Sequence, residues 1–183
     1  TDSPRAYLER CLETIEQLEP AIRAWVTLNN ENARHAADQS SLRYQRGQPL
    51  SPIDGMPLGI KDVLQTKDMP TELGSPIFKG RCTNLDSASV NALRLAGCVI
   101  VGKTVTTEFA FLKPGPTTNP FDSGATPGGS SSGTAAAVGA GMVPAALGNQ
   151  VVGSIIRPSS FCGNYAIKPT LGALHNGEGL SLS

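Results

Sequence analysis

The chain has 183 residues, which is long enough for one domain with a real hydrophobic core. Fifteen basic residues balance fifteen acidic ones, so the charge indicates neither a nucleic-acid partner nor a polybasic membrane-binding surface. The longest apolar stretches, 98–101 and 135–147, are too short or too interrupted for the roughly 20 apolar residues of a membrane span. The chain opens without methionine and shows no signal-peptide pattern, so we expect a fragment of a longer protein.

The cysteines and histidines do not form a recognisable metal-binding pattern. The four cysteines are far apart and form no C-x-x-C pair: Cys11, Cys82, Cys98 and Cys162. The two histidines, His35 and His175, are isolated as well, so we expect no zinc site. We interpret the cysteines as small buried residues in a reducing compartment, which favours a cytoplasmic protein.

The first third of the chain contains two helical patterns and two extended segments. Residues 4–18 repeat apolar side chains at a helical period, and 22–28 has an extended pattern. Residues 31–46 are polar with a stripe of alanines, which is typical of a surface helix. A Pro/Gly/Ser-rich loop over 48–57 leads into 57–63, a short apolar strand that contains a lysine.

A strand, a helix and a second strand in succession predict an α/β layered domain. Residues 86–96 form the expected helix, and 98–102 is a continuous apolar strand of the buried kind. A long Gly/Pro/Ser/Thr loop over 119–132 leads into an alanine-rich helix at 134–142. A short apolar segment, 143–147, precedes a second Gly/Ser turn.

The segment between Asp122 and Glu178 contains no acidic residue, and Arg157 and Lys168 are its only charged side chains. Segments so poor in charge are normally buried. This one nevertheless contains many hydroxyl groups: Ser130, Ser131, Ser132, Ser154, Ser159 and Ser160. Because buried hydroxyls need hydrogen-bond partners, we expect a buried polar network here and look for chemistry in it.

The sequence GGSSSGT at 128–134 has the glycine spacing of a phosphate-binding loop. Thr134 stands where that loop requires a lysine, and no convincing strand precedes it. Nucleotide binding is therefore disfavoured.

The pattern Gly129-x-Ser131-x-Gly133 matches the nucleophile elbow of α/β-hydrolases. That fold places the serine after a strand, with an acid and then a histidine downstream. A loop precedes Ser131, and no acidic residue lies between it and His175. This alternative needs triad residues from outside the chain.

A serine activated by a lysine distant in sequence is the remaining arrangement. A buried lysine can serve as a base, because desolvation disfavours the ammonium form and lowers its pKa. Lys61, Lys103 and Lys168 all border apolar strand-like segments, and composition does not choose among them. The alternative for each is a strand-end lysine that reaches solvent.

Several sequence motifs resemble those of the amidase signature family. They are G-I-K-D at 59–62, the Gly/Ser loop at 128–133, V-G-S-I-I-R-P at 152–158, F-C-G at 161–163 and K-P-T at 168–170. The resemblance runs from about residue 7 to residue 170 and includes the 24-residue spacing between the two serines of the pattern, Ser130 and Ser154. It identifies the chain as one amidase signature domain over 1–183, an incomplete N-terminal portion.

The resemblance implies a catalytic triad in which Lys61 is the base, Ser130 the relay with a cis peptide bond, and Ser154 the nucleophile. Backbone N–H groups would form the oxyanion hole: those of Val151, Val152, Gly153 and Ser154. We expect Ser131 either to support this network or simply to cap the following helix.

Three departures from the family pattern are visible beside the expected nucleophile. Gln150 replaces an aspartate and Val152 replaces a glycine, which predicts a reshaped oxyanion turn, because valine cannot adopt all glycine conformations. The arginine usually two residues after the nucleophile is three after it, at Arg157. We expect Arg157 to pair with a substrate carboxylate; the alternative is a structural arginine that binds loop carbonyls.

The family resemblance implies an α/β fold with a mixed central sheet flanked by helices. It further implies hydrolysis of a carboxamide without metal or organic cofactor. The expected substrate is a small-molecule amide, and a carboxylate on it is the expected partner of Arg157. Many family members pair, so a homodimer is one assembly open to this protein. Two alternatives stay open. One is the amidase subunit of a glutamine-dependent tRNA amidotransferase, and the other is a non-catalytic relative with a closed oxyanion turn.

Overall fold

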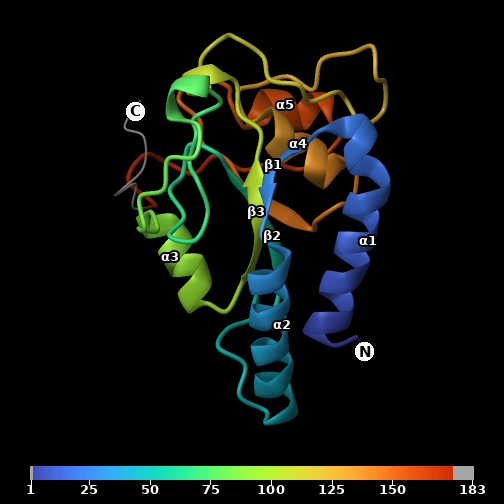
Figure 1. Cartoon of the computed structure of the whole chain (residues 1–183), viewed down its shortest axis with the longest axis vertical. Coiled ribbons are helices and arrows are strands. Elements are labelled where there is room, and N and C mark those ends of the chain that lie inside the picture. The colour runs from blue at the N-terminus through green and yellow to red at the C-terminus, as the bar shows by residue number, and fades with distance from the viewer. Residues whose placement is uncertain (1, 175–183) are drawn as a thin grey trace.

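Four strands form one mixed sheet at the centre of the computed structural model, which describes residues 2–174 (Figure 1). The strands are β1 (Trp25–Leu28), β2 (Pro57–Lys61), β3 (Val99–Thr104) and β4 (Ala145–Leu147). Their order is β1-β3-β2-β4; β1 runs antiparallel to β3, and the other two pairs are parallel. The mixed central sheet flanked by helices is thus confirmed.

Five α-helices surround this sheet: α1 (Pro4–Ile22), α2 (Asn30–Gln45), α3 (Ala88–Leu95), α4 (Ser132–Gly139) and α5 (Ile156–Phe161). Two short 3-10 helices cover Pro76–Phe78 and Glu108–Ala110. The first four α-helices agree with the sequence-based expectations within a few residues. The sequence does not predict helix α5, because six residues that include Pro158 and two serines show no periodic apolar stripe.

The helices cover both faces of the sheet. One apolar cluster joins α1, α2 and α4 to Trp25, Val99 and Val101, whereas the other packs Val90 of α3 against Ile100 and β2. The alternation of Val99, Ile100 and Val101 between the clusters follows from the two-residue period of a strand. Figure 1 shows α3 and α1 on opposite sides of the sheet.

The charge-poor segment is only partly buried. The beginning of the segment is buried: its three consecutive serines are at most 2% exposed (Ser130, Ser131 and Ser132). Helix α4, which begins at Ser132, continues into the core. Gly133 allows this close approach, because a Cβ there would collide with the Ala24 carbonyl and the Val105 backbone nitrogen. Val152, by contrast, is 91% exposed, so the low charge of the later part does not reflect burial within residues 2–174.

Three of the four cysteines are buried, as expected, but Cys82 is exposed and corrects the interpretation of all four as core residues. All four are free thiols. No helix among the described residues has the length and apolar character needed to cross a bilayer. His175 lies outside residues 2–174.

Candidate active site

Lys61 is the last residue of β2 and is completely buried. It is paired in register with Thr104 of β3, on the side of the sheet where α4 begins. Its Nζ donates hydrogen bonds to Ser130 Oγ, at 2.8 Å, and to the Asn149 carbonyl, at 3.2 Å. The structure therefore brings two of the three expected triad residues, 69 positions apart in sequence, into direct contact.

Burial lowers the pKa of Lys61 to about 7 from its usual value of 10.5, because desolvation penalises the ammonium form. No carboxylate pairs with Lys61 among the described residues. An amine with this pKa is substantially neutral near pH 7 and can accept a proton.

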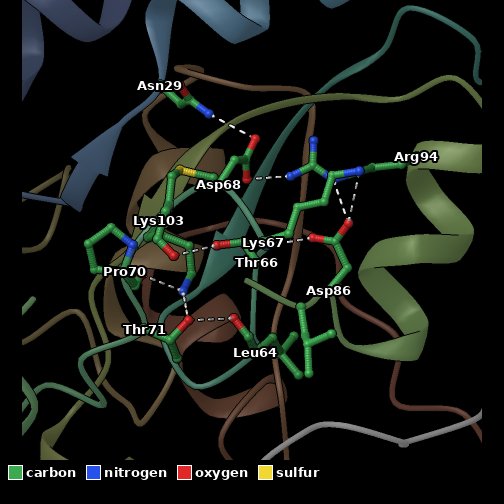
Figure 2. Close-up of polar contacts among 12 residues, drawn as sticks. Asn29, Leu64, Thr66, Lys67, Asp68, Pro70, Thr71, Asp86, Arg94 and Lys103 are labelled. Atoms are coloured by element: carbon green, nitrogen blue, oxygen red, sulfur yellow. Dashed lines mark hydrogen bonds and ion pairs between the residues drawn. The ribbon is translucent and has the colours of Figure 1, made fainter. Parts of the chain in front are cut away.

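The other two candidate lysines have different surroundings. Lys103 is buried as well, but its Nζ lies 2.8 Å from Asp62 Oδ1. The same Nζ donates to Thr71 Oγ1 at 2.7 Å and to the Pro70 carbonyl at 3.1 Å (Figure 2). Lys168 is exposed. Of the three, only Lys61 contacts a serine hydroxyl within residues 2–174.

Backbone and side-chain hydrogen bonds fix the loop that carries Ser130. The peptide bond between Gly129 and Ser130 is cis. The Ser130 carbonyl accepts a hydrogen bond from Thr107 N at 3.1 Å, and the Ser132 hydroxyl donates to the Val105 carbonyl at 3.4 Å. These contacts anchor the loop to the segment that follows β3, which places Ser130 over the end of the neighbouring strand β2.

Ser131 occupies the N-cap position of α4, but its hydroxyl makes no cap hydrogen bond. It donates instead to the Asn149 carbonyl at 3.3 Å, the same oxygen that Lys61 contacts. Its backbone N–H donates to the Ser154 carbonyl at 3.1 Å. Ser131 therefore links the Lys61–Ser130 pair to the turn that carries Ser154.

Ser154 is half-buried and lies in the turn between β4 and α5. Its hydroxyl makes no hydrogen bond within residues 2–174, so its connection to Ser130 runs through the backbone of Ser131 and not through its own side chain. Val151 and Val152, beside it, are 49% and 91% exposed. The sequence-based residues of the site therefore come from β2, the loop before α4 and this turn.

Arg157 is exposed and its guanidinium points back to the serine loop. Nε and Nη2 donate to the Gly129 carbonyl at 3.0 and 2.8 Å. This is the kind of contact expected from the alternative interpretation, in which the arginine binds a loop carbonyl.

Two residues of the site, Asn149 and Gln150, make contacts that the sequence does not indicate. The Asn149 carbonyl is a backbone group, and no side-chain pattern could have identified it as the acceptor shared by Lys61 and Ser131. Gln150 stands out in the sequence as a departure from the family pattern, but that pattern does not indicate its side-chain contacts across the turn.

A cavity of about 1130 Å³ borders the turn and reaches Ser131, Asn149 and Gln150. Neither Ser130 nor Ser154 lines it, so we do not assign it to substrate. No group of three or more His, Cys, Asp and Glu side chains within the described residues is arranged to hold a metal ion.

Comparison with known proteins gives consistent results. The family model described as Amidase matches residues 6–179. A glutamyl-tRNA(Gln) amidotransferase subunit from Chloroflexus aggregans is 45% identical over 170 residues, which are 90% of this chain and 35% of that protein. The chain therefore spans about a third of the length of such curated relatives.

Two solved structures extend the similarity to three dimensions. A crystal structure of an amidase has a TM-score of 0.87 and 33% identity, and the match covers all of this chain and 43% of that one. A structure described as a vestigial protein complex that reveals the origins of an s-triazine catabolic enzyme has a TM-score of 0.85 and 37% identity, over 88% of this chain and 37% of that one.

Proposed function

Because the chain belongs to the Amidase family, we propose that it carries the catalytic residues of a serine amidohydrolase. The reaction is hydrolysis of a carboxamide to a carboxylic acid and ammonia or an amine. The observation that carries this proposal is the 2.8 Å contact between Ser130 Oγ and Lys61, a buried lysine whose pKa is lowered to about 7.

In the proposed mechanism, neutral Lys61 accepts the Ser130 proton while Ser130 accepts the proton of Ser154. The Ser154 oxygen then attacks the amide carbonyl, and the backbone N–H groups of 151–154 bind the tetrahedral oxyanion. Each such donor is typically worth about 3 kcal/mol of transition-state stabilisation. The same relay returns a proton to the leaving amine, and water hydrolyses the acyl-enzyme, which regenerates Ser154.

The proposal includes a small-molecule amide as substrate and needs no metal or organic cofactor. The free cysteines support a cytoplasmic location. Assembly as a homodimer and binding of a substrate carboxylate by Arg157 stay sequence-based predictions.

A second candidate is the amidase subunit of a tRNA amidotransferase, favoured by the 45% identity to a protein that bears the name of such a subunit. Three departures from the family pattern beside the proposed nucleophile disfavour this candidate: Gln150, Val152 and the shifted Arg157. Co-purification with partner subunits, together with glutamine-dependent ammonia release, would favour this candidate over a free-standing amidase.

Labelling with a fluorophosphonate probe, followed by peptide mapping, tests the proposed nucleophile. The probe is applied to this chain and to any longer protein of which it is a part. We expect an adduct on Ser154 that is lost in Ser154→Ala and strongly reduced in Lys61→Ala. Lys79→Met removes an exposed lysine and is the matched control, with unchanged labelling.

Two results would contradict the assignment. The absence of any adduct on the longest protein would favour the non-catalytic alternative. An adduct on Ser131 would instead support the nucleophile-elbow alternative.

A further inference from the structure

Gln150 reaches across the turn that carries Ser154. Its Oε1 accepts two backbone hydrogen bonds, from Ile155 N at 2.7 Å and from Ile156 N at 2.9 Å. These N–H groups belong to the two residues that directly follow Ser154, where α5 begins. A single side-chain oxygen thus closes the turn from its first residue to its last.

The remaining N–H groups of the turn are free. Those of 151–154 donate no hydrogen bond within residues 2–174, whereas those of Ile155 and Ile156 are satisfied by Gln150. The free groups lie on an exposed part of the turn, because the side chains of Val151 and Val152 are 49% and 91% exposed. Gln150 therefore binds the N–H groups that follow Ser154, whereas the N–H groups of 151–154 are left available to a ligand.

Few contacts other than those of Gln150 hold this turn. The Ser154 carbonyl is held by Ser131 N and the Gly153 carbonyl by Arg157 N, both through the backbone. Without the acceptor at Gln150, the N–H groups of Ile155 and Ile156 would lose their partner, and the backbone of 151–154 could rotate toward other acceptors. Catalytic donors must be fixed before the reaction, since reorganisation during the reaction weakens their effect.

We propose that Gln150 is a positioning residue that holds the N–H groups of 151–154 open for the oxyanion and fixes the backbone of Ser154. This role rests on the proposed function, because it requires Ser154 to be the nucleophile. It assigns a purpose to the glutamine that departs from the family pattern at this position.

The test compares Gln150→Met, which removes the acceptor at similar size, with Gln150→Glu, which keeps an acceptor oxygen. Glu19→Met is the matched structural control, because the Glu19 carboxylate also accepts two backbone N–H groups, of Ala24 and Trp25, both at 2.9 Å, in another part of the fold. Saturation kinetics with the fluorophosphonate probe give a maximal labelling rate and a half-saturating concentration for each variant. Amide hydrogen exchange of residues 151–156 is measured in parallel.

We expect Gln150→Met to lower the maximal labelling rate of Ser154 at least about tenfold, because the oxyanion donors lose their fixed geometry. The half-saturating concentration and the pH midpoint of labelling should stay the same, and Ile155 and Ile156 should lose exchange protection. Gln150→Glu should label within a few-fold of the wild type. Glu19→Met should lose thermal stability but keep the maximal labelling rate.

Wild-type labelling rates in Gln150→Met would overturn the role of Gln150 while leaving Ser154 as the nucleophile. An equal loss of labelling in Glu19→Met would also overturn it, since the effect would then be one of general stability. A wild-type protein that does not label Ser154 at all refutes the proposed function and, with it, this role. Protection of Ile155 and Ile156 that persists in Gln150→Met would overturn the hydrogen-bonding basis.

Discussion

Lys61 and Lys103 lie on neighbouring strands, both completely buried, and face opposite sides of the sheet. Lys103 is paired in register with Ile60, so it points away from the side that Lys61 occupies. Its ammonium group lies 2.8 Å from the carboxylate of Asp62, the residue after Lys61. The carboxylate nearest to Lys61 in sequence, that of Asp62, is therefore paired with Lys103 on the other side of the sheet. Lys61 instead faces hydroxyl and carbonyl groups.

The first prediction concerns the pH dependence of Ser154 labelling. In the proposed mechanism the base is the neutral form of Lys61, so reactivity should be lost as the pH falls below its pKa of about 7 and gained as the pH rises through it. Between pH 6 and pH 8 the neutral fraction rises about tenfold, and we expect the labelling rate to follow it. Stopped-time labelling across pH 5.5–9 measures this, with Lys61→Met expected to be slow and independent of pH. A wild-type midpoint near pH 10 would show that Lys61 is not desolvated.

The second prediction concerns the ion pair of Lys103. Lys103→Met leaves the buried Asp62 carboxylate without its cation. Breaking such a pair typically costs about 3–5 kcal/mol, which is a large part of the stability of a domain. Asp62→Asn with Lys103→Met removes both charges, and we expect it to cost less than Lys103→Met alone. Urea unfolding of the single and double variants gives the free energies of unfolding and closes the double-mutant cycle.

Lys67→Met is the control for the second prediction. Lys67 is 58% exposed and lies 3.9 Å from Asp86, so its loss should change stability by less than about 0.5 kcal/mol. Additive effects of Asp62→Asn and Lys103→Met would show that the two groups do not act as a pair.

Much of the fold was predictable because helices and strands leave local periodic signals. The apolar period of α1, the alanine stripe of α2 and the continuous apolar strand β3 all appear where the sequence indicates them. Helix α5 left no such signal, because one and a half turns with a proline contain too few residues to show a period. The pairing of β1 antiparallel to β3 was also invisible, since strand direction depends on contacts between distant segments.

The site was less predictable from the residues alone, because its contacts join segments far apart in sequence. Lys61, Lys103 and Lys168 were equivalent candidates in composition, and only the three-dimensional contacts of Lys61 with Ser130 and of Lys103 with Asp62 separate them. Among the sequence-based arguments, only the resemblance to the family selects Lys61. The contacts of Gln150 and of the Asn149 carbonyl depend on the exact path of the turn, which no sequence motif encodes.

The third prediction concerns Val152, which replaces a glycine of the family pattern. Its side chain is 91% exposed, and its φ is not positive, so the turn does not require a glycine conformation at this position. We therefore expect Val152→Gly to change the labelling rate of Ser154 by no more than about twofold and to cost up to about 1 kcal/mol of stability through backbone entropy. Labelling kinetics and urea unfolding measure the two effects. A gain in labelling of tenfold or more would show that valine obstructs the turn.

The fourth prediction concerns Arg157, whose guanidinium donates two N–H groups to the Gly129 carbonyl, next to Ser130. Because this contact fixes the backbone beside the proposed relay serine, we expect Arg157→Ala to lower kcat by about tenfold for neutral and acidic amides alike, with small changes in KM. Steady-state kinetics on an amide and on its carboxylate-bearing counterpart measure this.

Arg46→Ala is the matched control for Arg157, because Arg46 is an exposed arginine at the end of α2, and it should leave both substrates unaffected. A change in KM for one substrate alone would instead support the expectation that Arg157 binds a substrate carboxylate. If Arg157→Ala raised KM for the acidic amide alone, by tenfold or more, the guanidinium would be a ligand of the substrate carboxylate, since a lost bidentate charge pair acts only on the substrate that carries the charge. An unchanged kcat and KM for both amides would contradict both roles. Loss of the guanidinium should lower kcat if it holds the Gly129 carbonyl, and should raise KM for the acidic amide if it binds the carboxylate.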